Sequence, residues 1–277
     1  MSDGHRWAVR SAAVIVAFVA SRCFAATAFE RLQPGVELAS FVTTPPGRPT
    51  IEFTVLRVEP RYVRVAVVDL RHLRATVPGV RSGQLAYSLR ELDRLRRPLA
   101  MINGGFTNSL VLPQPSGFVK IAGRVMSKLN VASNKQSGAL CISHGADVTI
   151  LKSNSDGLGR CEDALQSGPI VVEDPGKNGI KPGAVDARFA RSIIGVDEGG
   201  RVLLVQTSAA SLFDVAEALI DQRTVGLRVR TALNLDGDAD SGLLIHRRGS
   251  DLVRGNVDAT IPNAIAIVAR TPSGPGH

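Results

Sequence analysis

RSIIGVDEGGRVLLVQT, residues 191–207, carries the strongest structural signal in the chain. Two apolar runs rich in Val, Ile and Leu flank a Glu-Gly-Gly turn at 198–200, which predicts a β-hairpin with largely buried strands. The residues that follow, SLFDVAEALIDQ at 211–222, have helical periodicity and begin with Ser211, a good N-cap. The pattern indicates a β-sheet with a helix packed on it.

Shorter strand patterns continue in both directions from this hairpin. IEFTVLRV at 51–58 and YVRVAVVD at 62–69 alternate apolar and polar residues, and their short connection predicts a second hairpin. A second amphipathic helix is expected over 82–97, with Ser82 as its N-cap and leucines at helical spacing. The remaining strands are expected at 98–103, 117–123, 138–143, 147–152, 169–174, 231–236, 242–246 and 264–269.

The predicted strands outnumber the helices and do not alternate with them one for one, which argues against a doubly wound sheet. The sequence therefore predicts an α+β fold, with a mixed, mostly antiparallel β-sheet core and a few packed helices in a single domain. We expect this domain to span 51–270, after an extended Pro-rich surface segment at 29–50 and before a disordered tail at 271–277.

The first residues, 1–28, have the three parts of a secretory signal peptide. A basic start, HRWAVR, precedes the apolar run SAAVIVAFVAS and the small-x-small site ATA. The apolar run is shorter than the about 20 residues that a membrane-spanning helix needs. We therefore expect a secreted or periplasmic protein with no membrane span after cleavage, the alternative being a buried N-terminal strand or helix.

The charge balance bears on the class of partner. The chain has a net charge of +8, and removing the signal peptide leaves +6. The basic residues are scattered rather than clustered, so nucleic acid is not an expected partner. Anionic small substrates or anionic envelope polymers suit this charge better.

Cysteine usage agrees with export. Cys23 would leave with the signal peptide, so Cys141 and Cys161 remain as an even pair in an oxidising compartment. We predict a disulfide between them, which would restrain the Gly- and Ser-rich segment inside the loop. Two free, buried thiols are the alternative.

Three Gly-rich strand ends stand out as candidate binding loops: INGGF at 102–106, LQSGP at 165–169 and LNLDGDADSG at 233–242. Each follows an apolar strand and places a polar residue next to glycine. Glycine lets backbone N–H groups approach a ligand closely, and successive N–H groups can form an anion-binding nest. A single such turn is most often only a turn, but the joint occurrence of all of them favours a functional site.

These loops also carry a family resemblance. MINGGFTN, PSGFVKIAGRV, ALQSGPIVV, RFARSIIGVDEGGRVLLVQT and ALNLDGDADSGLLI occur in an order and spacing that resembles the phosphodiester glycosidase family. The similarity covers roughly residues 50–270. It implies hydrolysis of a sugar that is linked through its anomeric carbon to a phosphodiester.

The resemblance implies catalytic roles for Asp236, Arg191 and Asn103. It implies substrate binding by Gly104, Gly105, Gln166, Ser167, Gly168, Asn234, Gly237 and Ser241. The chain departs from the family pattern at Asp238, where a second glycine is expected, and at Asp240, which adds another charge. These differences bear on the leaving group more than on the class of reaction.

The chemistry of the residues fits this reaction. An arginine can hold a phosphate oxygen pair in bidentate geometry, which suits Arg191, although a surface arginine is the alternative. A carboxylate can stabilise an oxocarbenium-like centre, activate water or attack, which suits Asp236, although an Asp before Gly often only caps its own turn. The amides of Asn103, Gln166 and Asn234 can bind sugar hydroxyls or phosphate oxygens.

The alternating aspartates raise the question of a metal ion. An EF-hand is excluded because its sixth position is Ser241 instead of Gly and its twelfth is Arg247 instead of Glu. A looser Ca²⁺ site at Asp238 and Asp240 stays open, with a solvated acidic turn as the alternative. No cofactor is otherwise expected.

The leading prediction is an exported hydrolase that cleaves the glycosidic C–O bond of a sugar-1-phosphodiester in envelope or extracellular glycans. One alternative is a non-catalytic envelope-glycan-binding protein on the same scaffold. Trp7 lies in the signal peptide and few aromatic residues remain, which disfavours the broad stacking face of a glycan binder. The other alternative is a phosphodiesterase that cuts the P–O bond of the same anionic sugar-phosphate substrate.

Overall fold

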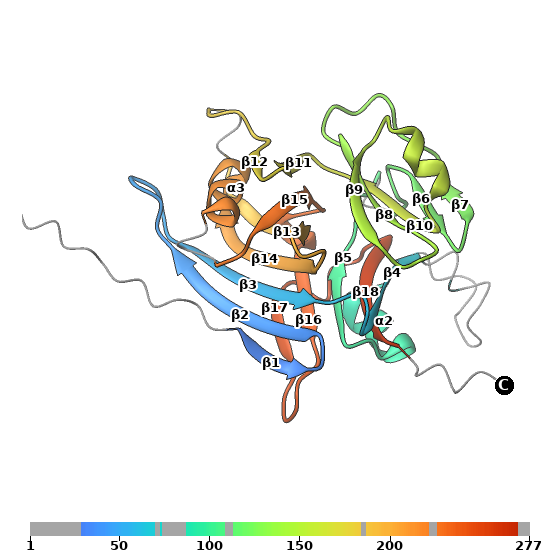
Figure 1. Ribbon diagram of the computed structural model, residues 1–277, viewed down its shortest axis with the longest axis horizontal. Helices are drawn as coiled ribbons and strands as arrows, with labels where there is room; N and C mark the ends of the chain where they lie inside the picture. Colours follow the sequence, from blue (N-terminus) through green and yellow to red (C-terminus); the bar gives the residue numbers. More distant parts are fainter. Residues whose placement is uncertain are drawn as a thin grey trace, which may run out of the picture.

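The computed structural model describes residues 29–69, 73, 87–108, 113–183, 187–221 and 226–270. The expected signal peptide at 1–28 and the tail at 271–277 lie outside these ranges. Within them the strands form three sheets in which every strand pair is antiparallel, and two α-helices pack on the sheets (Figure 1). The α+β prediction is confirmed.

The largest sheet has eight strands in the order β1-β2-β3-β14-β13-β15-β11-β12. These are β1 (Glu30–Gln33), β2 (Val36–Thr43), β3 (Ile51–Val58), β14 (Val202–Ala210), β13 (Phe189–Asp197), β15 (Val229–Asn234), β11 (Ile170–Glu173) and β12 (Lys177–Asn178). The hairpin predicted at 191–207 is β13–β14 at its centre. Its turn is held by Asp197, whose buried carboxylate accepts hydrogen bonds from the N–H groups of Gly199 and Arg201, each at 2.9 Å.

The two other sheets have five strands each. One has the order β7 (Arg124–Ser127), β6 (Val119–Ile121), β10 (Asp163–Ser167), β8 (Gly138–Ile142) and β9 (Val148–Lys152). The other has the order β17 (Leu252–Gly255), β16 (Gly242–Ile245), β5 (Ala100–Asn103), β18 (Asn263–Ala269) and β4 (Val63–Asp69). Two short 3₁₀ helices, η1 (Asp156–Arg160) and η2 (Asp238–Asp240), lie in the connections.

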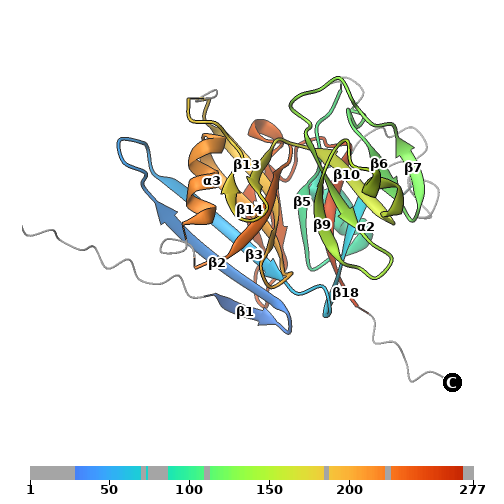
Figure 2. The same ribbon diagram turned by 45° about the horizontal axis from the view of Figure 1, so that its top comes forward.

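One continuous core joins the three sheets. Leu56 of β3, Ile194 of β13, Ile102 of β5 and Leu140 of β8 belong to the same buried cluster. Figures 1 and 2 show α3 (Leu212–Ile220) on one side of the molecule and the β6–β10 sheet on the opposite side. Because side chains from every sheet share this core, the sheets pack as one unit.

Two expectations for the N-terminal half are wrong. Strands β3 and β4 do not form a hairpin: β3 pairs with β2 and β14, whereas β4 pairs with β18 in another sheet. Both edges of β3 are already occupied, so the chain turns after it and continues into the neighbouring sheet. Residues 29–50 do not simply cover the surface either, because β1 and β2 extend the eight-stranded sheet and bury apolar side chains such as Leu38 and Phe41.

The helix predicted at 82–97 is shorter than expected. Helix α2 (Leu89–Arg96) begins after Ser88, whose Oγ accepts a hydrogen bond from the N–H of Glu91, while the Glu91 carboxylate accepts one from the N–H of Ser88. The predicted cap, Ser82, lies outside the described residues. Helix α3 is confirmed with its predicted cap, since Ser211 Oγ accepts from the N–H of Asp214 at 3.1 Å.

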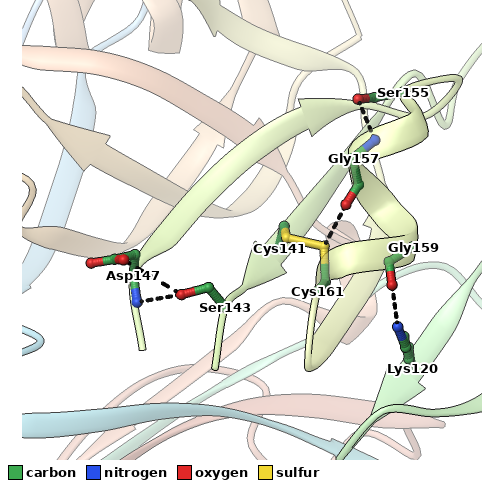
Figure 3. The surroundings of a disulfide bond; sticks show 8 residues. All are labelled: Lys120, Cys141, Ser143, Asp147, Ser155, Gly157, Gly159 and Cys161. Atoms are coloured by element: carbon green, nitrogen blue, oxygen red, sulfur yellow. Dashed lines mark hydrogen bonds between the residues drawn. A yellow bond between two sulfur atoms is a disulfide. The ribbon is translucent and has the colours of Figure 1, made fainter. Parts of the chain in front are cut away.

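The predicted disulfide is confirmed. Cys141 of β8 is bonded to Cys161, which directly follows η1, with 5.4 Å between the Cα atoms (Figure 3). The bond closes the segment that contains β9 and η1. Within the described residues, no helix has the length and hydropathy needed to cross a membrane.

Candidate active site

The three Gly-rich strand ends meet in space. Asn103, the last residue of β5, donates a hydrogen bond from Nδ2 to the carbonyl of Asp236 at 2.8 Å, and the N–H of Asp236 donates to the carbonyl of Gly104 at 2.9 Å. Asn234, the last residue of β15, donates from Nδ2 to the carbonyl of Gly168, just after β10, at 2.9 Å. Loops predicted from distant parts of the sequence therefore form one cluster.

The glycines of the first loop are required by close packing. A Cβ atom on Gly104 would lie 1.9 Å from Oδ1 of Asn263, and one on Gly105 would lie 2.7 Å from the carbonyl oxygen of Gln166. The N–H of Gly105 donates to the Asn263 side chain at 2.8 Å, and the N–H of Gly104 donates to its carbonyl at 3.0 Å. These N–H groups hold the loop, so their predicted contact with a substrate would have to compete with existing bonds.

Asn103 connects two loops through its side chain. Its Oδ1 accepts from the N–H of Gly242 at 3.1 Å, and its Nδ2 donates to the carbonyl of Asp236. The side chain is fully buried. These contacts give Asn103 a positioning role for the Asp236 turn, and its contact with a substrate stays a prediction.

Gln166 also holds loops together. Its Oε1 accepts from the N–H groups of Phe118 and Asn130, both at 2.9 Å, and its Nε2 donates to the carbonyls of Asn130 and Gln136 at 2.9 and 3.0 Å. Because all four hydrogen-bonding positions of the amide are occupied, Gln166 holds the loops of the site in place and has no free position for a substrate. Ser241 has a comparable place, since its Oγ lies 3.0 Å from Oγ of Ser192 in a buried pair.

Asp236 is the acidic residue of the cluster. Its Oδ1 accepts a hydrogen bond from the N–H of Gly237 at 2.9 Å. Burial raises the pKa of the Asp236 carboxyl to about 6, repulsion from Asp240 adds to the rise, and backbone hydrogen bonds from Gly237 and Thr107 oppose it. A carboxyl with this pKa is mainly ionised at neutral pH yet close to its titration, which suits acid–base or charge-stabilising chemistry.

Arg191 lies beside the same turn. A Cβ atom on Gly237 would be 3.8 Å from Nη1 of Arg191. The guanidinium is held by its other nitrogens, because Nε donates to the carbonyl of Ala210 at 3.0 Å and Nη2 to that of Ala187 at 2.9 Å. Burial lowers the pKa of Arg191 and the nearby charge of Asp238 opposes this effect. The structure thus brings Arg191 to the turn that carries Asp236, with Nη1 directed to that side.

Several buried polar atoms at the loops have no hydrogen-bond partner among the described residues. They are Oγ of Ser167, Oδ1 of Asn234 and Nδ2 of Asn263. Leaving such an atom unpaired costs about 1–3 kcal/mol unless water or a ligand completes it. Ser167 lies next to Gly105, with 3.7 Å between its Cβ and the position of a Cβ on that glycine. The cluster therefore offers donors and acceptors to a polar ligand.

Asn263 is the residue that the sequence did not reveal. It begins β18 and anchors both glycines of the first loop, although 158 residues separate it from Gly105. The available signal was a polar residue between Pro262 and a long apolar run, which also fits an ordinary strand start. Only the pairing of β18 with β5 gives this residue its place.

The acidic turn shows no arrangement of metal ligands. Among the described residues, no group of three or more His, Cys, Asp or Glu side chains is placed to hold a metal ion. Asp238 and Asp240 lie in η2, and burial with repulsion from Asp238 raises the pKa of Asp240. Calcium binding at Asp238 and Asp240 stays a prediction.

Comparison with known protein families identifies the class of protein. The model of the phosphodiester glycosidase family matches residues 97–268, from just before β5 into β18, which includes every loop of the cluster. The chain belongs to the phosphodiester glycosidase family. No curated protein sequence matches the chain.

Solved structures share the fold. The catalytic domain of zebrafish N-acetylglucosamine-1-phosphodiester α-N-acetylglucosaminidase, auto-inhibited by its pro-peptide, superposes with a TM-score of 0.63 at 18% identity over 89% of this chain and 87% of that chain. A hypothetical protein from Synechocystis gives 0.61 at 16% identity, covering 89% and 64% of the two chains. A candidate exported protein from Burkholderia pseudomallei gives 0.52 at 11% identity, covering 79% and 74%.

Proposed function

We propose that the protein is an exported hydrolase that releases a sugar from a glycosyl phosphodiester by cleaving the bond between the anomeric carbon and the phosphate oxygen. The main support is the placement of Arg191 beside the turn that carries Asp236, whose pKa is raised to about 6. Family membership supplies the reaction class, and the zebrafish enzyme is named for the same kind of bond. The disulfide and the N-terminal sequence support export.

In this proposal Arg191 binds the phosphodiester, with Nη1 pairing with a non-bridging oxygen. When the C–O bond breaks, its electron pair leaves with the phosphate monoester, which needs little protonation. The carboxylate of Asp236 stabilises the positive charge that develops at the anomeric carbon. Water then forms the new C–O bond and gives up a proton to Asp236 or to solvent. Ser167 and Asn234 offer their unpaired buried atoms to sugar hydroxyls.

The test uses the full chain, purified from the compartment to which it is exported, and a chromogenic sugar-1-phosphodiester. We expect Asp236→Asn to lower kcat/KM by about 10³-fold and Arg191→Gln by about 10²-fold, as for other charge-stabilising groups. Asp147→Asn on the β8–β9 turn and Arg124→Gln on β7 are matched, exposed controls and should retain full activity. Full activity in both site variants would overturn the site assignment.

The same assay separates the alternatives. Hydrolysis in ¹⁸O-labelled water should place the label in the sugar, because the proposed attack is at the anomeric carbon. Label in the phosphate would instead establish P–O cleavage by a phosphodiesterase. Saturable binding of the substrate without any turnover would support the glycan-binding alternative.

A further inference from the structure

A second groove lies at the other end of strand β16. This strand starts at Gly242, which is bonded to Asn103 in the site cluster, and it ends one residue before His246. A strand rises about 3.3 Å per residue, so His246 is roughly 13 Å from Gly242 along β16. His246 lines a groove of about 760 Å³ between β1 and the turn that joins β16 to β17. The groove is therefore separate from the candidate active site.

The groove is positively charged. Arg31 from β1 and Arg247 and Arg248 from the β16–β17 turn line it, with Glu30 as the one acidic residue of its lining. None of these arginines forms an ion pair within the described part of the chain. Among the described residues, Arg247 makes only a long hydrogen bond, from Nε to the carbonyl of Ser250 at 3.4 Å. Two segments more than 200 residues apart in sequence thus bring unpaired cations to one concave surface.

His246 of the groove binds two carboxylates. Its Nδ1 lies 2.7 Å from Oδ1 of Asp251, and its Nε2 lies 2.6 Å from Oδ1 of Asp93 on α2. Asp251 lies in the same turn as Arg247 and Arg248, and it would be their nearest neutralising partner in sequence. These contacts connect the turn to α2, and within the described residues both carboxylates pair with His246 and not with the groove arginines.

We propose that this groove binds the phosphodiester backbone of a linear anionic polymer. Guanidinium groups pair well with phosphate oxygens, and several of them along a groove can contact successive phosphates of one chain. The volume falls in the range of ligand sites, about 300–1,000 Å³, and is far larger than one phosphate needs. Leu32 and Leu99, which are partly buried, also line the groove and can contact the apolar parts of the polymer.

A membrane surface fits the groove less well. Proteins that bind at the membrane interface insert large apolar or aromatic side chains next to their basic residues. The exposed large hydrophobic residues of the described chain are Val42, Tyr62, Val125, Val131 and Phe189. None of them lines the groove. Its concave shape and its charge favour a polymer strand over a lipid surface.

The proposal does not depend on catalysis, and it is tested by binding. The probe is fluorescently labelled synthetic poly(glycerol phosphate), titrated with the full chain at low and physiological salt. We expect the triple variant Arg31→Gln, Arg247→Gln, Arg248→Gln to bind at least 10-fold more weakly and with a smaller salt dependence. A control triple variant, Arg124→Gln, Arg160→Gln, Arg228→Gln, removes the same charge from exposed positions elsewhere and should change Kd less than 2-fold.

The other readouts keep the result interpretable. Turnover of the small chromogenic substrate should be unchanged in both triple variants, because the groove is separate from the site. Equal loss of polymer binding in the two variants, or no loss in the groove variant, would overturn the proposal. Binding to phosphatidylglycerol vesicles with no binding to the polymer would overturn it in favour of a membrane partner.

Discussion

Strand β10 connects two regions that are built in opposite ways. Its first residue, Asp163, follows the Cys161 half of the disulfide, and its last residues, Gln166 and Ser167, belong to the candidate active site. At the disulfide end, the Asp163 carboxylate accepts from the N–H of Ala122 at 2.8 Å and of Val67 at 3.3 Å. At the site end, Oγ of Ser167 has no partner within the described residues.

The two ends of β10 differ in how strongly they are stabilised. The disulfide corner is closed by a covalent bond and by hydrogen bonds such as that from Nζ of Lys120 to the carbonyl of Gly159, at 2.8 Å (Figure 3). The site has no covalent cross-link among the described residues and is held by hydrogen bonds and close glycine packing, and it keeps a partly buried acid and unpaired polar atoms. Sites that bind polar ligands commonly retain such unfavourable features because function requires them.

Removing the side-chain amide of Asn103, which holds the site, is the strongest test of the difference between the two regions. In Asn103→Ala, the N–H of Gly242 and the carbonyl of Asp236 lose their partners in a buried place, so we expect unfolding to be easier by about 3–4 kcal/mol. Asn256→Ala is a matched control, since this exposed amide also makes two hydrogen bonds, to Ala239 and Asp258. Urea unfolding of both variants measures the difference, and equal losses would show that the Asn103 contacts carry no special weight.

Removing the covalent bond tests the other region. The double variant Cys141→Ala, Cys161→Ala should lose about 3 kcal/mol of stability, as expected for a loop of this length. Activity at 25 °C should stay within about 2-fold, because no hydrogen bond of the candidate site depends on the cysteines. Thermal unfolding and kcat/KM are measured on the same preparation. A folded variant with activity reduced more than 10-fold would show that the corner controls the site through β10.

Local patterns predicted the parts of both regions that depend on near neighbours in sequence. The β13–β14 turn, the strand-end loops and the Cys141–Cys161 pair were all visible from spacing and residue type. The failures involve long-range pairing. The hairpin expected for 51–69 was wrong because β2 and β14 occupy both edges of β3.

The same limit applies to the site. Asn263 has no local feature that marks it, and it gains its role only because β18 pairs with β5. The side chains of Asn103 and Gln166 were predicted to bind substrate, but no local pattern indicates that their amides are occupied by other loops. A polar residue at a strand end has the same appearance in sequence whether it faces a ligand or holds a neighbouring loop.

The raised pKa of Asp236 predicts a smaller change in the free energy of unfolding. The change is of opposite sign, because a substitution here should stabilise the protein. Between pH 3.8 and about 6 the folded protein keeps a proton that the unfolded chain releases, so the free energy of unfolding falls as the pH rises through this window. Asp236→Asn lacks this penalty and should be more stable than wild type by up to about 3 kcal/mol at pH 7, although its activity is lost. Urea unfolding from pH 4 to pH 8 should show the difference disappearing near pH 4. A variant less stable than wild type at pH 7 would contradict this origin of the pKa shift.

The charges of Asp238 and Asp240 should have a still smaller effect, on the pH dependence of kcat/KM. Repulsion from Asp240 contributes more to the raised pKa of Asp236 than repulsion from Asp238 does. Because activity needs the carboxylate form, kcat/KM should fall as the pH drops through about 6. Asp240→Asn should move this limb to lower pH by less than about 1 unit, and Asp238→Asn by less still.

Calcium provides the control for this last comparison. If Asp238 and Asp240 hold a Ca²⁺ ion, its charge already offsets their repulsion. The two substitutions should then shift the low-pH limb of kcat/KM only in protein treated with EDTA, and millimolar Ca²⁺ should return the limb to its original pH. A shift that is the same with and without Ca²⁺ would assign the two carboxylates to direct electrostatic control of Asp236. Such a result would show that Asp238 and Asp240, which depart from the expected family pattern, tune the pH dependence of the reaction.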